Sequence, residues 1–248
     1  MRRLSSGMMV MVVMSGLFMA GCATTPPIPT VPATAKSISP EPRDGGWMKR
    51  HESFNALAKK GGFDVLFVGD SITQGWEGNG KDVWAKAIAP LGAANFGIGG
   101  DRTEHVLWRF EHGNLEGAMS PKVMVLMLGT NNTGHRKDKP EEIAAGVGAI
   151  LKTFHERFPK TKILLFAIFP RGATLADPAR VNNDAANKLL ATYDGFWNIK
   201  YLDINARFLT PDGTLTREVM SDLLHPGPQG YQIWADAVVP ELKAALGK

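Results

Sequence analysis

Five short runs of mostly apolar residues alternate with longer segments of helical periodicity, and this alternation restricts the fold more than any other feature of the sequence. The runs are Val65–Val68, Ala93–Phe96, Val123–Leu128, Ile163–Ile168 and Ile199–Asp203. They lack a regular polar residue at every second position, which is typical of strands covered on both faces. The runs therefore predict strands of a parallel sheet.

The segments between the runs carry apolar residues three or four positions apart. Asp138-Lys139-Pro140 and Asp177-Pro178 predict two helix starts, and another helix is expected after Pro228. The apolar positions are Ile143, Val147, Ile150, Leu151, Phe154 and Phe158; Val181, Ala185 and Leu189; and Tyr231, Trp234, Val238 and Leu242. Strands that alternate with helices predict an α/β protein, a three-layer α/β/α sandwich around a five-stranded parallel sheet.

The first 21 residues predict a lipoprotein signal peptide. Arg2 and Arg3 precede an uncharged run over residues 7–20, and the run ends in Met19-Ala20-Gly21-Cys22. The last four residues resemble a bacterial lipobox, which implies lipidation of Cys22; ordinary secretion is the alternative. Residues 22–45 are rich in proline and predict a flexible linker, so we expect the folded domain to span residues 46–248.

A lipid on Cys22 would anchor the chain to a membrane without a protein segment that crosses it. We therefore expect the chain in the bacterial cell envelope. Ala23 follows the cysteine, where aspartate often signals retention at the inner membrane, so the outer membrane is favoured.

The charge of the chain gives no reason to expect a nucleic-acid partner. The net charge is +4, and removal of Arg2 and Arg3 leaves 26 basic residues against 24 acidic ones, or +2. The basic residues are scattered, whereas nucleic-acid binding calls for a basic stripe or patch. Because Cys22 is the only cysteine, no disulfide can form within the chain.

Ser71 follows the first predicted strand directly, in the stretch VLFVGDSITQGW. In a parallel α/β sheet, binding sites lie outside the carboxyl ends of the strands. The serine could cap the next helix, which is the commoner role, or act as a nucleophile. The second role requires a base that takes its proton and donors that stabilise the charge on the substrate carbonyl.

His225 is the strongest candidate for the base. Asp222 precedes it by three residues and Pro226-Gly227-Pro228 follows, so carboxylate and imidazole can lie on one turn. On their own, both could equally be surface loop residues. Of the other histidines, His135 lies in a polar loop, and His51, His105, His112 and His155 fall in or beside helical patterns.

Gly100 and Asn131 are candidates for the oxyanion hole. A glycine offers an unobstructed backbone N–H, and asparagine offers a side-chain amide donor. The stretch Asp101-Arg102-Thr103-Glu104 has the form of a capping box, which predicts a helix start directly after Gly100. The nearby NFGIGG lacks the GxGxxG spacing of a dinucleotide-binding loop, and the bend could also serve only to turn the chain.

These blocks together resemble those of the SGNH or GDSL hydrolase family. Ser71 lies outside a GxSxG elbow, because Thr73 replaces the second glycine, which argues against an α/β-hydrolase. GDS supplies Ser71, NFGIGGD supplies Gly100, GTNN supplies Asn131, and DLLH supplies Asp222 and His225. The resemblance implies a flavodoxin-like sheet, a catalytic triad of Ser71, Asp222 and His225, an oxyanion hole of Ser71, Gly100 and Asn131, and no metal or organic cofactor.

Within that family the chain is most similar to the catalytic subunits of intracellular platelet-activating-factor acetylhydrolase. The shared blocks are NFGIGGD, HVLWRF, GTNN and FPRG. Arg102 stands where those subunits favour threonine, and they carry no export signal. The resemblance to these subunits therefore supports the fold and the site residues more strongly than it supports a shared substrate.

We expect a serine esterase that hydrolyses short-chain, chiefly acetyl, esters, with O-acetyl groups of carbohydrate as the favoured substrate. Ile72, Thr130 and Leu224 adjoin the site residues and could close an acyl pocket around acetyl. Three alternatives stay open at this level: a lipid-directed acetylhydrolase or lysophospholipase of the same mechanism, a flavodoxin-like FMN-binding protein, and a surface binding module without catalysis.

Overall fold

A computed structural model of the chain describes residues 24–248. The predicted signal peptide and Cys22 lie outside the described residues. Five strands form one sheet: β1 (Val65–Gly69), β2 (Ala93–Gly97), β3 (Val123–Met127), β4 (Lys162–Phe166) and β5 (Ile199–Leu202). All neighbouring strands are parallel, in the order β2-β1-β3-β4-β5. The five predicted strands are confirmed, with ends that shift by one or two residues.

The helices are α1 (Gly46–Lys60), α2 (Ser71–Gln74), α3 (Lys81–Val83), α4 (Thr103–Arg109), α5 (Pro140–Arg157), α6 (Pro178–Leu190) and α7 (Pro228–Leu246). Shorter 3-10 turns span Lys36–Ile38, Gly75–Glu77, Ala89–Leu91, Ala191–Tyr193 and Asn205–Phe208, and π turns span Trp84–Ile88, Phe110–Asn114 and Asn132–Arg136. Proline occupies the first position of α5, α6 and α7, as predicted, because its missing N–H costs nothing there. Among residues 24–248, no helix is both long and apolar enough to cross a bilayer.

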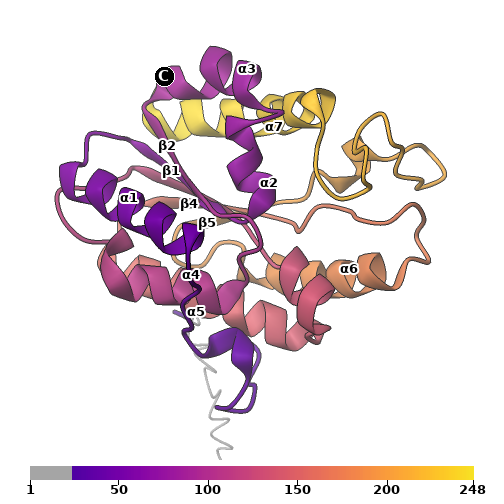
Figure 1. Ribbon diagram of the computed structural model, residues 1–248, viewed down its shortest axis with the longest axis horizontal. Helices are drawn as coiled ribbons and strands as arrows, with labels where there is room; N and C mark the ends of the chain where they lie inside the picture. Colours follow the sequence, from indigo (N-terminus) through magenta and orange to yellow (C-terminus); the bar gives the residue numbers. More distant parts are fainter. Residues whose placement is uncertain (1–23) are drawn as a thin grey trace, which may run out of the picture.

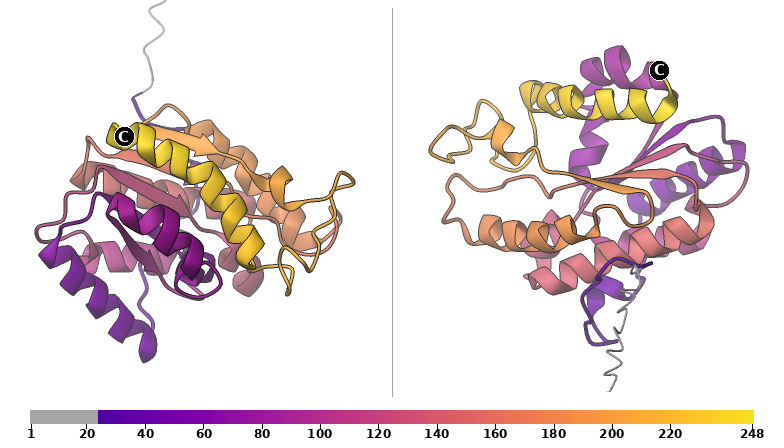
Figure 2. Two further views of the ribbon diagram at one scale, coloured as in Figure 1. Left: turned by 90° about the horizontal axis from the view of Figure 1, so that it is seen from above. Right: turned by 180° about the vertical axis from the view of Figure 1, so that it is seen from behind.

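The helices cover both faces of the sheet, which confirms the three-layer arrangement. Helices α1, α4, α5 and α6 lie on one side of the sheet, and α3 and α7 lie on the other (Figure 1). Figure 2 shows the same layers from above and from behind. In β1, Leu66 and Val68 pack with the first group, whereas Val65 and Phe67 pack with α7. Alternate side chains of a strand point to opposite faces, so strands buried on both sides are continuously apolar.

The inward face of α6 differs from the predicted one. Val181 was expected to face the core with Ala185 and Leu189, but its side chain is 53% exposed. The buried face carries the polar residues Arg180, Asn183 and Asn187 beside Ala186 and Leu190. Asn187 donates to the carbonyl of Ile168 (2.9 Å) and accepts from its N–H (2.7 Å). The amides replace sheet partners that the backbone lacks just after β4, so burial here follows hydrogen bonding and not hydropathy.

Parts of the segment predicted to be a flexible linker, between Pro26 and Arg43, pack against the domain, which corrects that expectation for them. Ile28 packs beside Gly148 of α5, and the carbonyl of Ser37 accepts a hydrogen bond from Thr103 Oγ1 (2.8 Å). In Figure 1 this indigo segment lies against α4 and α5. Proline content indicated an extended chain correctly, but contacts with distant residues hold the segment in place.

Gly146 of α5 gives a test of this packing. A Cβ at Gly146 would lie 2.4 Å from Thr103 Oγ1 and 2.7 Å from the carbonyl oxygen of Ser37. We expect Gly146→Ala to lower the free energy of unfolding by about 1–3 kcal/mol because of overpacking. Gly46→Ala is the matched control, since its Cβ would have no heavy atom within 4 Å. Urea unfolding measures both, and equal stability of the two variants would contradict this packing.

Candidate active site

Ser71 lies at the carboxyl end of β1, where the chain turns sharply into α2. Gly69 is required at this turn, because a Cβ there would lie 2.1 Å from Thr73 Oγ1 and 2.5 Å from the carbonyl oxygen of Met127. Asp70, not Ser71, caps the helix: its Oδ1 accepts the N–H of Ile72 at 2.9 Å. The hydroxyl of Ser71 is therefore free of the capping role that its position in the sequence suggested.

The structure brings Ser71 to the predicted base. Its Oγ lies 2.8 Å from His225 Nε2, although 154 residues separate them in the sequence. His225 Nδ1 lies 2.6 Å from Asp222 Oδ2. With a proton on Nδ1, the imidazole donates to Asp222 and can accept the serine proton at Nε2. Ser71, His225 and Asp222 thus have the geometry of a serine-hydrolase triad.

The loop before α7 sets the position of Asp222. Its Oδ1 accepts the backbone N–H groups of Leu224 (3.0 Å) and His225 (2.8 Å). Burial acts to raise the pKa of Asp222, but the hydrogen bonds from the side chain and backbone of His225 outweigh it, and the pKa lies below its usual range. The carboxylate therefore stays charged at neutral pH and can accept a hydrogen bond from His225 Nδ1.

The three predicted oxyanion donors lie on neighbouring loops at the same edge of the sheet. Gly100 adopts a positive φ of 77°, which favours glycine. A Cβ placed on the adjacent Gly99 would be 3.7 Å from Ser71 Cβ, so this bend borders the nucleophile. Asn131 is 6% exposed and uses one amide hydrogen for the carbonyl of Asp101 (3.0 Å). Its second amide hydrogen and the N–H groups of Ser71 and Gly100 are available for an oxyanion.

The buried side chain of Asp101 holds these loops in place. Its Oδ2 lies 3.0 Å from Arg109 Nη2, and its Oδ1 accepts hydrogen bonds from Trp47 Nε1 (2.6 Å) and Arg43 Nη1 (3.2 Å). Asp101 and Arg109 have no exposed surface. Neither Arg43 nor Arg109 was singled out from the sequence, because only the fold brings them to Asp101.

The predicted capping box of α4 is wrong. The helix begins at Thr103, and the N–H of Arg102 is donated to His105 Nδ1 (3.0 Å). Asp101 binds Arg109 instead of capping the helix, and Glu104 pairs with Arg102 and Arg136. The motif was misread because both carboxylates form ion pairs, Asp101 with Arg43 and Arg109 and Glu104 with Arg102 and Arg136.

Two other histidines, His51 and His105, lie in the interior of the protein. His51 is buried and stacks on Trp47, and burial is the main cause that lowers its pKa to about 4. His105 is also buried, and burial, with help from neighbouring arginines, lowers its pKa to about 3. A pKa this low makes each imidazole a weak proton acceptor, and neither contacts Ser71.

The residues predicted to close an acyl pocket are buried to different degrees. Ile72 is fully buried in the core beside α7, and its carbonyl accepts a hydrogen bond from Tyr231 (2.7 Å). Thr130 is 1% exposed, and its hydroxyl accepts from Arg171 Nη1 (3.1 Å). Leu224 is half-buried. Ile72 and Thr130 therefore fill space behind the site and do not line an open pocket.

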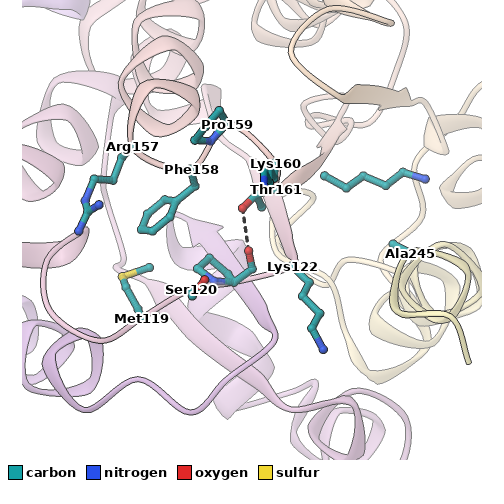
Figure 3. A pocket seen from close by; sticks show the side chains of 11 residues that line it. Met119, Ser120, Lys122, Arg157, Phe158, Pro159, Lys160, Thr161 and Ala245 are labelled. Atoms are coloured by element: carbon teal, nitrogen blue, oxygen red, sulfur yellow. Dashed lines mark hydrogen bonds between the residues drawn. The ribbon is translucent and has the colours of Figure 1, made fainter.

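A large cavity lies elsewhere, at the opposite edge of the sheet. Its volume is about 750 Å³, and its walls include Met119, Lys122, Phe158 and Lys162 (Figure 3). These residues precede or begin β3 and β4, whereas Ser71 follows β1, so the cavity is remote from the triad. Among residues 24–248, no group of three or more His, Cys, Asp or Glu side chains is arranged to hold a metal ion.

Asp70 gives a test of the electrostatics beside the nucleophile. Burial, with a contribution from the charge of Asp101, raises its pKa from 3.8 to about 7. Between these pH values the folded state binds more protons than the unfolded state. The free energy of unfolding should therefore fall as the pH rises, by up to about 1.4 kcal/mol per pH unit.

Asp70→Asn keeps the oxygen that caps α2 and should flatten this pH dependence between pH 4.5 and 7.5. Urea unfolding at several pH values is the measurement, with the exposed Asp44→Asn as the control. An unchanged slope in Asp70→Asn would show that the carboxyl group of Asp70 is not the source of the pH dependence.

Comparisons with known proteins agree with the site. The model of the GDSL-like Lipase/Acylhydrolase family matches residues 67–233. Human platelet-activating factor acetylhydrolase IB subunit alpha1 is 39% identical over 189 residues, which cover 76% of this chain and 79% of that protein. The alpha2 subunit from Mus musculus is 39% identical over 202 residues, which cover 81% and 84%.

Two solved structures share the fold. A GDSL-like lipase from Bacteroides thetaiotaomicron superposes with a TM-score of 0.58 at 21% identity, over 79% of this chain and 97% of that one. An acetylxylan esterase from Geobacillus stearothermophilus has a TM-score of 0.58 at 21% identity, over 73% and 94%. The chain therefore belongs to the GDSL-like lipase/acylhydrolase family and is a carboxylic ester hydrolase.

Proposed function

We propose that this esterase hydrolyses short-chain, chiefly acetyl, esters, and that O-acetyl groups on carbohydrate are its substrates. The observation that carries the proposal is the continuous contact from Ser71 Oγ to His225 Nε2 (2.8 Å) and from His225 Nδ1 to Asp222 Oδ2 (2.6 Å). This arrangement supplies a nucleophile, a base and a group that orients the base.

In the first half of the reaction, Ser71 Oγ attacks the ester carbonyl carbon while its proton passes to His225 Nε2. The N–H groups of Ser71 and Gly100 and the amide of Asn131 stabilise the oxyanion of the tetrahedral intermediate. His225 then returns the proton to the departing alcohol, which leaves an acyl group on Ser71. Water attacks this acyl group with His225 again as the base, and the acid and the free serine are regenerated.

The preference for a short acyl group has two supports. Ile72 and Thr130 are packed into the interior directly next to Ser71 and Asn131, which leaves little room for a long chain behind the nucleophile. The related platelet-activating factor acetylhydrolase subunits and the acetylxylan esterase are named for acetyl esters. One methylene in an apolar pocket changes binding by only about 1–3 kcal/mol, so we expect a preference and not strict exclusion.

A lipid-directed acetylhydrolase or lysophospholipase of the same mechanism is the second candidate, and the names of the curated relatives favour it. The full chain can be offered acetylated xylan fragments and acetylated phospholipid analogues in parallel, with acetate release as the measurement. Faster release from the saccharides is the expected result. Release of acetate from the phospholipids alone would contradict the carbohydrate substrate and favour the lipid-directed enzyme.

Ser71→Ala should reduce esterase activity by at least about 10³-fold, because within residues 24–248 no other hydroxyl forms a hydrogen bond with His225. Hydrolysis of p-nitrophenyl esters from acetate to octanoate measures both this loss and the acyl preference. The wild-type rate should be highest for acetate or propionate. Unchanged activity of Ser71→Ala would rule out the mechanism, and a maximum at octanoate would rule out the short-chain preference.

We also propose that Cys22 is lipidated and anchors the enzyme in the bacterial cell envelope, with the outer membrane favoured. The supports are the basic start, the uncharged run and the lipobox-like Met19-Ala20-Gly21-Cys22. In a bacterial host, the wild-type chain should fractionate with membranes, and Cys22→Ser should not be lipidated. Mass spectrometry of the N-terminal peptide is the measurement, and an unmodified Cys22 in the mature chain would refute the anchor.

A further inference from the structure

Four arginines lie beside the loops that carry Gly100 and Asn131, and we call them the arginine rim: Arg43, Arg102, Arg136 and Arg171. Arg43 Nη1 donates to the carbonyl of Gly99 at 2.8 Å. Arg171 Nη1 donates to the carbonyl of Thr130 at 2.9 Å. Each of the two loops that hold the oxyanion donors therefore has a guanidinium group directly against it.

The rim has more positive than negative charge. Asp101 is shared by Arg43 and the buried Arg109, and Glu104 is shared by Arg102 and Arg136. The remaining carboxylate, that of Asp138, also pairs with Arg136. The four rim guanidinium groups, with that of the buried Arg109, thus outnumber the three carboxylates that pair with them. Arg171 forms no ion pair with a carboxylate among residues 24–248.

Arg171 lies between the Asn131 loop and the His225 loop. Its guanidinium contacts the first loop through Thr130, and the N–H of the next residue, Gly172, donates to the carbonyl of Leu223 in the second (2.9 Å). The carbonyl of Arg171 accepts a hydrogen bond from Arg180 Nε at 3.2 Å. These contacts fix the backbone of Arg171 and hold an unneutralised charge between two loops of the active site.

The imidazole of His135 is affected by the charges of three of the rim arginines. Partial burial lowers the pKa of this imidazole, and Arg102, Arg171 and Arg43 lower it further. The side chain is therefore neutral near pH 7 and adds no charge of its own. Three rim arginines act on this one exposed residue, although they come from three separate parts of the sequence.

We propose that the arginine rim is a subsite for a carboxylate on the alcohol part of the ester, so that the substrates are acetyl esters of acidic saccharides. This inference rests on the proposed function. An acetyl group carries no charge, so an anion at the rim must belong to the alcohol part. Guanidinium groups bind carboxylates through paired hydrogen bonds of favourable geometry.

The surface favours a saccharide over a lipid. Among residues 24–248, the exposed large apolar side chains are Leu57, Leu175 and Val181, which offer little surface for an alkyl chain. A phosphate could bind the same arginines, so a charged phospholipid belongs in the test as the competing source of the anion.

The test uses two acetyl esters of similar size, 4-acetoxybenzoate and the uncharged 4-acetoxybenzamide. For the full chain, kcat/KM for each ester is divided by its rate of spontaneous hydrolysis. We expect the corrected value for the charged ester to be at least about 10-fold higher, and to fall toward that of the neutral ester as salt is added. A ratio near one that does not respond to salt would overturn the subsite.

Variants at Arg171 test whether this residue causes the preference for the charged ester. Arg171→Ala should lower the charged-to-neutral ratio of kcat/KM about 10-fold, and Arg171→Lys should restore part of it. Arg157→Ala is the control, because Arg157 is an exposed arginine in the wall of the remote cavity and should leave the ratio unchanged. An equal fall for both esters in Arg171→Ala would mean that Arg171 only supports the Thr130 loop, which contradicts the proposal.

A comparison of acetylated polysaccharides with acetylated phospholipids tests which class of molecule supplies the anion. Acetate should be released faster from acetylated polygalacturonate than from acetylated xylan or from acetylated, negatively charged phospholipid vesicles. Preference for the vesicles would overturn the acidic saccharide. If none of these esters nor 4-acetoxybenzamide were hydrolysed, the proposed function itself would fail, which is distinct from hydrolysis without charge preference.

Discussion

The buried carboxylate of Asp101 is the interaction on which the active-site edge depends. It lies in contact with Arg109 of α4, Trp47 of α1 and Arg43 of the N-terminal segment, while its carbonyl accepts the amide of Asn131. Removal of one partner from a buried ion pair costs about 3–5 kcal/mol, because the other charge stays unpaired. One residue therefore joins three separate parts of the chain and fixes the loops that carry Gly100 and Asn131, the candidate oxyanion donors.

The fold could be predicted because its main cause is local in the sequence. Continuous apolar runs such as Val123–Met127 are buried on both faces, and prolines at positions such as Pro140 begin helices where expected. The errors arose where polar groups decide burial. Asn183 and Asn187 turn the inward face of α6 away from the predicted apolar stripe, and residues such as Ile28, Ser37 and Arg43 are held by contacts that proline content does not reveal.

The approach of Ser71 to the Asp222 and His225 pair could be predicted because these residues lie in short motifs at loops that a parallel sheet brings to one edge. The supporting residues could not. Arg43 and Arg171 belong to no catalytic motif, and their roles depend on contacts with Gly99 and Thr130 across the fold. Ile72 and Thr130 were expected near the acyl group because they neighbour Ser71 and Asn131 in the sequence. Helical and loop geometry instead turns their side chains into the interior.

Activation of Ser71 by His225 can be tested with a fluorophosphonate, which forms a covalent bond to an activated serine and displaces fluoride. Peptide mass spectrometry after treatment of the full chain identifies the labelled residue. We expect one stoichiometric adduct on Ser71, and His225→Ala should slow its formation by at least about 10²-fold. An adduct on another residue, or equally fast labelling of Ser71 without His225, would contradict this activation.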